Sequence, residues 1–431
     1  MIYHLSKNKT TINGEIEIGG SKSESNRLLM LREYSSDFKI NNLSESDDTR
    51  TLIESLISNN KIIDINHAGT AMRFLLSYYA SKPNSEVILT GSDRMKNRPI
   101  GVLVKALRDL GANIEYEGKE GYPPIKIIGK NLIDNEVSLP ANISSQYISS
   151  LMMLGLRINN GIRLNLEGNI TSEPYIFMTK KLIEKIGYNV IINNNQIEVL
   201  GKNKSFAKIV EVESDWSSAS YFYSIVALSE DARISLKTFK RNSIQGDSII
   251  SKIYERLGVK TIFKDSYVII SKNKVANLPQ RIKLDLSDSP DLAQTIAVTC
   301  LGLGIECELS GLHTLKIKET DRIEALKKEF IKLGVDNINT SNNKIYFKAG
   351  QKLNKNIKIS TYQDHRMALS FAALAVVVDI SIEAPNVVSC KECGAPKLRH
   401  HICEECGFYR GKRIINKNAA AQEVGNDNTE A

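Results

Sequence analysis

Two Cys-x-x-Cys pairs stand near the end of the 431-residue chain. Cys390 and Cys393 form the first pair, and Cys403 and Cys406 form the second after nine intervening residues. Four thiolates at this spacing can bind one zinc ion tetrahedrally, and in a reducing compartment they bind metal in preference to forming disulfides. Four of the six cysteines fall within these 17 residues, so the pattern predicts a structural zinc site.

Cations at the starts of predicted helices are the second feature that could do chemistry. The positive end of a helix dipole lies at its N-terminus, where a further cation is unfavourable and an anion is favoured. A single Ser or Asp at such a position is most simply an N-cap. Several cations together instead favour anionic ligands bound between them. The cations concerned are Lys22, Arg27, Arg98, Arg322 and Arg366.

The elements that must position these cations repeat along the chain. Four segments share an amphipathic helix closed by a Gly and followed by two short alternating strands. Weaker copies, each with a helix and a strand, lie at residues 49–65 and from residue 364 onward. Six such α/β units in two groups of three predict a two-lobed protein. The closing glycines are Gly111, Gly187, Gly258 and Gly334.

Length and composition are those of a folded protein with two or three domains. The N-terminus lacks the apolar core of a signal peptide, and the longest apolar run, residues 367–378, is too short to cross a bilayer. We therefore expect a cytoplasmic protein with reduced cysteines. The net charge of +8 fits small anionic substrates, nucleic acid or simply a solvated basic surface.

Polar motifs follow one another in a fixed order along the chain. They are GGSKSESNR (19–27), HAGTAMR (67–73), RPIGVLVKALRDLGA (98–112), SSQY (144–147), SEPY (172–175), VESDWSSASYF (212–222), SPDLAQTIA (289–297), IKETDRIEAL (317–326) and DHRMALS (364–370). Their order resembles that of the 5-enolpyruvylshikimate-3-phosphate synthase family over residues 1–389. The resemblance implies an α/β, two-lobed enolpyruvyl-transferase fold with three βαβαββ repeats in each lobe. Residues 19–213 would form lobe 1, and residues 1–18 and 214–389 would form lobe 2.

The activity implied is transfer of the enolpyruvyl group of phosphoenolpyruvate to the 5-hydroxyl of shikimate 3-phosphate, with release of phosphate. This is a step of the shikimate pathway, and the family needs no cofactor for it. Lys22, Asp291 and Glu319 would be catalytic. Asp291 would take the hydroxyl proton, and Glu319 would protonate the methylene carbon. Outside their motifs, a surface carboxylate or an N-cap would explain either acid.

The resemblance also assigns binding residues for the two anionic substrates. A monomer without membrane partners is expected, and His365 would be structural. The phosphoenolpyruvate site would comprise Lys22, Gly69, Arg98, Gln146, Arg322 and Arg366. The shikimate 3-phosphate site would comprise Lys22, Ser23, Arg27, Ser144, Ser145, Gln146, Ser172, Tyr175, Asp291, Thr314 and Lys318.

Two positions depart from the family pattern, and one relative is a rival interpretation. His67 stands where the family often has Asn or a small residue, and Thr314 stands where an Asn commonly contacts the substrate. The rival is UDP-N-acetylglucosamine enolpyruvyl transferase, which carries a Cys in the loop before its Arg-Pro motif. Residues 91–99, GSDRMKNRP, contain no Cys, which favours the shikimate enzyme.

The end of the chain resembles a different family. Residues 390–413 are similar to the zinc ribbon of the bacterial large-subunit ribosomal protein L32, without the basic arm that precedes it there. Residues 414–431 have the composition of a disordered tail. The synthase family continues after Ser389 with a Lys of the phosphoenolpyruvate site, where this chain has Cys390. A natural fusion, an engineered junction and an assembly error would each give this sequence.

A ribosome-associated protein with an enzyme-like body is the remaining alternative for function. Affinity for RNA depends mainly on phosphate contacts from Lys and Arg, so the missing basic arm disfavours it. Ribosome co-sedimentation at several salt concentrations separates this alternative from the enzyme.

Our first prediction is that the tail binds one zinc ion through Cys390, Cys393, Cys403 and Cys406. Elemental analysis of protein purified without chelators should find about one zinc per chain. Because the metal folds the ribbon only, chelation should remove the zinc and leave the main domains folded by circular dichroism. Protein free of zinc after such a purification would refute the prediction.

Overall fold

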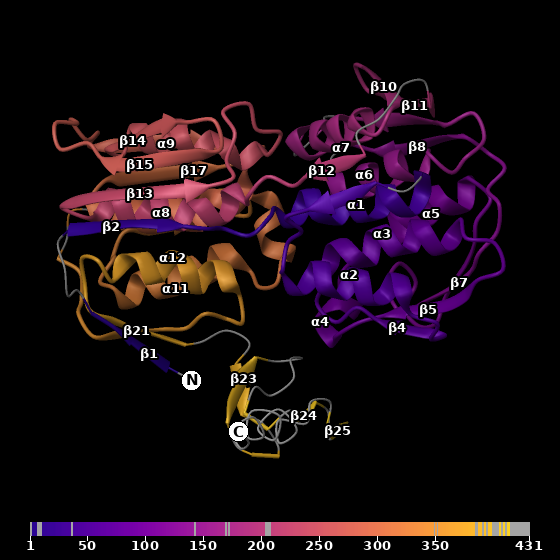
Figure 1. Cartoon of the computed structure of the whole chain (residues 1–431). Helices are drawn as coiled ribbons and strands as arrows, with labels where there is room; N and C mark the ends of the chain where they lie inside the picture. Colours follow the sequence, from indigo (N-terminus) through magenta and orange to yellow (C-terminus); the bar gives the residue numbers. More distant parts are fainter. Residues whose placement is uncertain are drawn as a thin grey trace, which may run out of the picture.

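The computed structural model describes residues 2–6, 11–35, 38–141, 144–168, 170, 173–202, 208–348, 350, 352–383, 387–389, 392–393, 395–398, 405–406, 408–409 and 412–413. Their apolar side chains form two separate buried cores. The first draws on residues 28–212, and the second on Ile18 and residues 216–382. We call the parts built on them lobe 1 and lobe 2, which lie side by side in Figure 1.

Lobe 1 contains two four-stranded sheets of the same design. In each, the first two strands are parallel, and an antiparallel hairpin lies beyond the second. The order is β4-β5-β7-β6 in one sheet and β8-β9-β11-β10 in the other. The unit built on the first sheet comprises, in chain order, β4 (Ile62–Asp64), α3 (Gly69–Ala80), β5 (Glu86–Thr90), α4 (Asp93–Lys96), α5 (Gly101–Asp109), β6 (Asn113–Tyr116) and β7 (Ile125–Ile128). The unit built on the second sheet comprises β8 (Glu136–Pro140), α6 (Ser145–Leu154), β9 (Ile162–Glu167), α7 (Glu173–Lys185), β10 (Tyr188–Asn193) and β11 (Gln196–Lys202).

Lobe 2 repeats this design twice. Its sheets have the orders β2-β13-β15-β14 and β16-β17-β19-β18. The unit built on the first sheet comprises β2 (Thr11–Ile16), α8 (Trp216–Leu228), β13 (Asp231–Lys237), the 3-10 helix η1 (Gly246–Ile249), α9 (Ile250–Glu255), β14 (Val259–Phe263) and β15 (Tyr267–Lys272). The unit built on the second sheet comprises β16 (Arg281–Asp285), the 3-10 helix η2 (Pro290–Leu292), α10 (Ala293–Leu303), β17 (Glu306–Ser310), the 3-10 helix η3 (His313–Ile317), α11 (Arg322–Lys332), β18 (Ile338–Thr340) and β19 (Ile345–Phe347).

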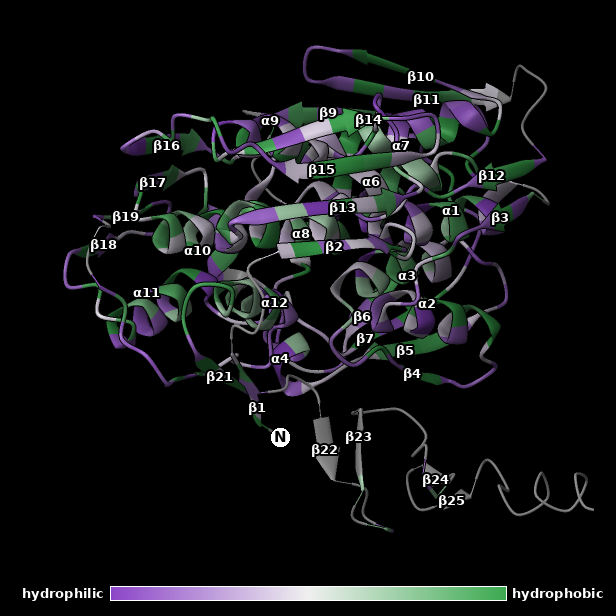
Figure 2. Cartoon of the chain, turned by 60° about the vertical axis from the view of Figure 1, so that its left-hand side comes forward, coloured by the Kyte–Doolittle hydropathy of each residue, from purple (hydrophilic) through white to green (hydrophobic). Residues whose placement is uncertain are grey.

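The glycines predicted to close the repeated helices do so. Gly111, Gly187, Gly258 and Gly334 all have φ between 82° and 95°, a left-handed conformation that costs a residue without Cβ little. Each lies between a helix and the hairpin that follows. Figure 2 shows the amphipathic character of α11, whose hydrophobic side includes the buried Ile323, Leu326 and Phe330.

Smaller elements complete each lobe. In lobe 1, α1 (Lys22–Ser35) and α2 (Asp47–Ile57) accompany a parallel pair, β3 (Lys39–Asn41) and β12 (Ile209–Glu211). In lobe 2, α12 (His365–Leu374) accompanies β1 (Ile2–Leu5), β20 (Ile357–Ile359) and β21 (Ile380–Glu383). The expectation that residues 49–65 form one repeat is wrong at its end. β4 pairs in parallel with β5 and so opens the next sheet.

Small hydroxyl side chains fix the central helices against one another. In lobe 2, Thr295 of α10 lies 3.1 Å from both Ser220 of α8 and Ser370 of α12. In lobe 1, Ser150 of α6 donates to Ser77 of α3 over 2.7 Å. All of these groups are buried. Small residues let the helices approach closely, and the hydrogen bonds satisfy polar atoms that would otherwise be costly to bury.

The lobes are joined where the chain crosses between them twice, at residues 19–21 and 211–215. The two crossings lie together: Gly20 and Ser214 form an isolated bridge, and Ser21 N donates to Glu213 O over 2.8 Å. Lobe 1 is therefore inserted between β2 and α8 of lobe 2. In Figure 1 this crossing lies between the right-hand end of β2 and the start of α1.

The described parts of the C-terminal segment form two small hairpins. β22 (Val387–Ser389) pairs with β23 (Pro396–Leu398), and β24 (Phe408–Tyr409) pairs with β25 (Lys412–Arg413). Cys393 and Cys406 lie in turns, whereas Cys390 and Cys403 fall outside the described residues. Among the helices that the structure describes, none combines the length and apolar composition needed to span a membrane.

The crossing provides our second prediction. A Cβ on Gly20 would lie 1.8 Å from Asn42 O, whereas a Cβ on Gly19 would meet nothing within 4 Å. Because the clash is with main chain, Gly20→Ala should lower the free energy of unfolding by about 1–3 kcal/mol. Gly19→Ala, the matched control, should change it by less than about 0.5 kcal/mol. Urea unfolding followed by the fluorescence of Trp216 measures both; equal effects would contradict the close approach.

Candidate active site

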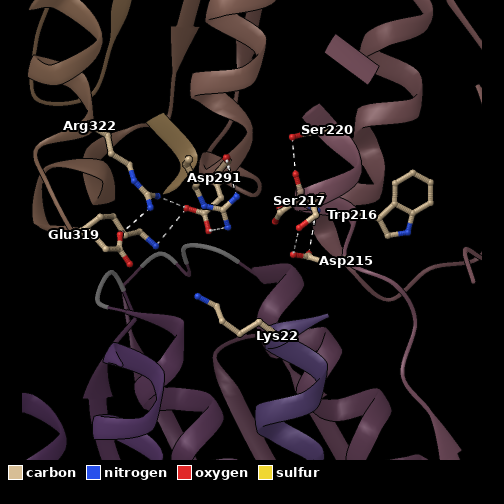
Figure 3. Close-up of polar contacts among 12 residues, drawn as sticks. Lys22, Asp215, Trp216, Ser217, Ser220, Asp291, Glu319 and Arg322 are labelled. Carbon is tan, nitrogen blue, oxygen red and sulfur yellow. Dashed lines mark hydrogen bonds and ion pairs between the residues drawn. The ribbon is translucent and has the colours of Figure 1, made fainter. Parts of the chain in front are cut away.

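Arg322 forms the centre of the site on lobe 2. It is the first residue of α11, is 1% exposed, and donates to three carboxylates. Its Nη1 lies 2.8 Å from Asp291 Oδ1, its Nη2 lies 2.8 Å from Glu319 Oε2, and its Nε lies 2.7 Å from Asp364 Oδ2. Figure 3 shows Asp291 and Glu319 on either side of this guanidinium. One cation thus places both predicted catalytic acids.

Two further cations contact Asp291. Arg366 Nη2 lies 3.1 Å from Asp291 Oδ2, and Lys318 Nζ lies 3.6 Å from Asp291 Oδ1. Arg366 is the second residue of α12, whose N-cap Asp364 accepts from Arg366 N over 2.8 Å. Asp364 therefore links the starts of two helices, because its other oxygen binds Arg322. Two of the five cations predicted at helix starts, Arg322 and Arg366, thus meet at Asp291.

The charges around the two acids keep both ionised. Burial alone would raise the pKa of Asp291, but Arg366, Lys318 and Arg322 outweigh it and hold the pKa well below its usual range. Burial likewise opposes ionisation of Glu319, and Arg322, Lys22 and Lys318 again lower its pKa. Both carboxylates are therefore unprotonated at neutral pH in the ligand-free protein.

Lobe 1 places Lys22 and Arg98 opposite these acids. Lys22 begins α1, lies 3.8 Å from Asp48, and points toward the lobe 2 carboxylates in Figure 3. Arg98 lies so close to the start of α3 that a Cβ on Gly69 would be 2.4 Å from its Nη1. Burial, and then the neighbouring Arg73, lower the pKa of Arg98 to about 10. The mutual repulsion of Arg98 and Arg73 favours an anion bound beside them.

A second group in lobe 1 surrounds Arg27. This side chain is 1% exposed and donates from Nε to Thr179 Oγ1 over 2.7 Å and from Nη2 to Ser149 Oγ over 3.0 Å. Its guanidinium carbon lies 5.7 Å from the centre of the Tyr175 ring. Burial lowers its pKa to about 10, which still leaves it charged at neutral pH.

The start of α6 lies beside the start of α3. Ser144 is its N-cap and accepts from Gln146 N, while Ser145 is buried. The amide of Gln146 donates to Thr70 Oγ1 over 3.1 Å, which ties the start of α6 to the first turn of α3. The serines and Gln146 are thus presented by two adjacent helix starts.

Tyr175 of lobe 1 lies beside Arg27, and it is close enough to Asp247 and Asp291 of lobe 2 for their charges to affect it. Burial, and then Asp247 and Asp291, raise its pKa well above the usual value, so it is a neutral phenol.

Asp247, in η1, was not among the site residues predicted from the sequence. Burial and Asp291 raise its pKa to about 7, and Ser217 donates a hydrogen bond to it. An acid at a helix start, in the Gln-Gly-Asp sequence 245–247, was the available signal.

The structure also places three further residues named from the sequence: Thr314, Ser23 and His365. The hydroxyl of Thr314 is buried without a hydrogen-bond partner, so it can accept or donate to a ligand. Ser23 lies beside Arg27, whose Nη1 donates to Ser23 O. Partial desolvation, Arg366 and Lys22 lower the pKa of His365, which is an exposed residue, so its imidazole is neutral at pH 7. Ser172 lies outside the described residues.

An α/β protein whose cleft combines paired acids with cations at helix starts is built to act on small anions. A family model, EPSP synthase (3-phosphoshikimate 1-carboxyvinyltransferase), matches residues 52–392. The chain belongs to this family.

Curated relatives and solved structures agree with that assignment. A 3-phosphoshikimate 1-carboxyvinyltransferase of Bacteroides fragilis is 44% identical over 382 residues, covering 88% of this chain and 92% of the relative. One from Vibrio campbellii is 34% identical, covering 85% and 91%. An EPSP synthase structure from Acinetobacter baumannii matches with a TM-score of 0.71 at 20% identity, covering 89% and 94%. This last likeness concerns the fold.

The end of the chain matches a second family. The Ribosomal L32p protein family is similar to residues 379–417. Because the synthase match extends to residue 392, the two overlap over residues 379–392. The sequence change from one family to the other therefore falls within this overlap, which contains β22 and Cys390.

The Arg322 cluster provides our third prediction. Arg322→Met would leave Asp291, Glu319 and Asp364 close together without their shared cation. The free energy of unfolding at pH 7 should fall by about 3–5 kcal/mol, because buried charges lose their partner. Lys105→Met, which breaks an exposed pair with Asp109, is the control and should cost less than about 1 kcal/mol.

The direction in which the stability of Arg322→Met changes with pH tests whether loss of the shared cation causes the destabilisation. In the native protein the pKa values of Asp291 and Glu319 are depressed, so the stability they contribute is present above their ordinary values of 3.8 and 4.5 and declines as the pH falls through and below them. Without Arg322 these pKa values should rise, so the stability deficit of the variant relative to the native chain should be smaller at pH 5 than at pH 7. A stability deficit of the variant that is the same at both pH values would contradict this explanation.

Proposed function

We propose that this chain transfers the enolpyruvyl group of phosphoenolpyruvate to the 5-hydroxyl of shikimate 3-phosphate, releasing phosphate. The observation that carries the proposal is the convergence of cations from both lobes on two partly buried acids. Lys22 and Arg98 come from lobe 1, and Arg322 and Arg366 come from lobe 2. Two polyanions can be held together only where such charges are already arranged.

Phosphoenolpyruvate would lie against these four cations. Gly69 supports this position, because the absence of a Cβ leaves room for Arg98 beside the start of α3. Gln146 is held at the same place by Thr70. The free N–H groups at the start of α3 add donors for a carboxylate or phosphate.

Shikimate 3-phosphate would lie between Arg27 and Lys318. We assign its binding to Ser144, Ser145, Ser172 and Tyr175 in lobe 1 and to Thr314 in lobe 2, with Lys22, Ser23, Gln146 and Asp291 beside them. The unpartnered hydroxyl of Thr314 supports this role at a position where Asn is usual in the family. Because these residues come from both lobes, we propose that the substrate closes the lobes around it.

The acids divide the proton transfers. Ionised Asp291 would orient the 5-hydroxyl and accept its proton as the hydroxyl oxygen attacks. Glu319 would protonate the methylene carbon of phosphoenolpyruvate and later remove a proton from it as phosphate leaves. A substrate anion that draws Arg322, Lys22 and Lys318 toward itself would weaken their effect on Glu319, raise its pKa and so let it hold a proton. Lys22, opposite both acids, would stabilise the charge on the departing phosphate.

The wider assignments rest on the family and on the sheet pattern. We propose that the β3–β12 pair with α1 and α2, and the β1-β21-β20 sheet with α12, are the incomplete third repeats of the two lobes. A cytoplasmic monomer needing no cofactor for catalysis is proposed on the same basis, as are lobe boundaries at residues 19–213 and at 1–18 with 214–389.

For the tail we propose a structural zinc ribbon over residues 390–413. The donor set of four Cys fits zinc, and both described Cys lie in turns next to short antiparallel hairpins, the arrangement that a ribbon needs. Cys390, Cys393, Cys403 and Cys406 would hold the metal, which supplies only folding stability to the ribbon. The similarity to a ribosomal family keeps ribosome association through this segment as the second candidate function.

The fourth prediction concerns turnover. Because Cys390 stands where the family has a Lys for phosphoenolpyruvate, binding of this substrate should be weaker by roughly tenfold to more than a hundredfold. Shikimate 3-phosphate should bind more nearly as usual, and turnover should be low. The measurement is phosphate release that requires both substrates, with calorimetry for each ligand.

Two variants separate the causes of low turnover. Replacing all residues after Ser389 by a family-like end that begins with Lys should restore activity. Ending the chain at Ser389, which removes the ribbon but supplies no Lys, should not. Ordinary turnover and an ordinary KM for phosphoenolpyruvate in the unaltered chain would contradict the prediction.

A further inference from the structure

Arg94 of lobe 1 makes a hydrogen bond to lobe 2, apart from residues 19–21 and 211–215 where the chain crosses between the lobes. It belongs to α4, which Figure 1 shows at the lower edge of lobe 1. Its Nη2 donates to Lys318 O of lobe 2 over 3.0 Å. Arg94 is exposed, and Lys318 O belongs to the main chain directly before Glu319.

The turn that carries Arg94 is well anchored in lobe 1. Ser92 caps α4 by accepting from Met95 N, and Ser92 N donates to Asn66 O over 3.0 Å. The hydroxyl of Ser92 lies 2.8 Å from His67 Nδ1. Met95 is 1% exposed and fixes the other side of the turn in the core. His67, one of the departures from the family pattern, thus helps to support this turn.

The segment that Arg94 contacts is irregular. Residues 318–321 connect η3 to α11 and belong to no helix or strand. Lys318 ends η3 with an extended conformation, its ammonium lies 3.6 Å from Asp291, and the next side chain, Glu319, binds Arg322. A bond to the Lys318 carbonyl therefore acts on the backbone that carries both side chains.

We propose that Arg94 is a positioning residue that fastens residues 318–321 to lobe 1 when the lobes close on shikimate 3-phosphate. The inference rests on the function proposed above. The Arg94–Lys318 bond joins the lobes, so it can form only when they are together and adds free energy to the closed state alone. A ligand that binds the closed state then has an apparent affinity proportional to the closed fraction.

The test compares Arg94→Ala with Lys96→Ala. Lys96 lies on the same turn, is exposed, and pairs with Asp93 within lobe 1. Shikimate 3-phosphate should bind Arg94→Ala about three- to tenfold more weakly, and Lys96→Ala as it binds the native chain. The ligand-free variants should unfold at the same temperature as the native chain, since Arg94 is exposed.

The radius of gyration from small-angle scattering, measured against ligand concentration, distinguishes a role in lobe closure from a purely structural role. All three proteins should reach the same radius of gyration at saturating shikimate 3-phosphate, and Arg94→Ala should need the higher concentration. Arg94→Lys, whose ammonium can still donate to a carbonyl, should recover part of the affinity. Equal affinity of Arg94→Ala and the native chain would overturn the inference while leaving the proposed function intact. Failure of the native chain to bind shikimate 3-phosphate would overturn both.

Discussion

The pairing of one buried guanidinium with three carboxylates is the interaction on which the cleft depends. Arg322 fixes Asp291, Glu319 and Asp364 at once, and Asp364 in turn caps the helix that presents Arg366. The acids are thus held ionised and oriented before any substrate arrives. The same arrangement makes the site sensitive to an incoming anion, because an anion that competes for Arg322 would raise the pKa of Glu319.

The cores explain how such a charged cluster can be held in place. Helices α8, α10 and α12 meet through buried hydroxyls, so their starts are fixed relative to one another. In lobe 1, the hydroxyl of Ser150 lies 3.0 Å from Arg73 O and 2.7 Å from Ser77 Oγ and ties α6 to α3 in the same way. Helix starts aligned by their neighbours hold Arg322 and Arg366 against the same carboxylate, Asp291. The two cores therefore fix the positions of the charged groups from which the site is built.

Features that depend on local sequence were predictable, and those that depend on distant contacts were not. The closing glycines and the N-caps Ser144, Asp321 and Asp364 follow from residue type and position. The grouping of Arg322 with Asp291 was implied only by resemblance, because 31 residues separate them. Nothing local indicates the Arg94 contact, which spans 224 residues. The short strand β4 was misassigned because periodicity cannot show which strand a segment will pair with.

The insertion of lobe 1 into lobe 2 has a consequence for the order in which the chain can fold on the ribosome. Thr11 of β2 pairs with Asp231 of β13, and Ile2 of β1 pairs with Glu383 of β21. The first strands made must therefore wait for partners made far later, roughly 10–40 s for β13 at ordinary rates of synthesis. Lobe 1 emerges whole in that interval and can fold first. The N-terminal strands of lobe 2 spend this time as unpaired edges, the state in which a nascent chain most needs protection from aggregation.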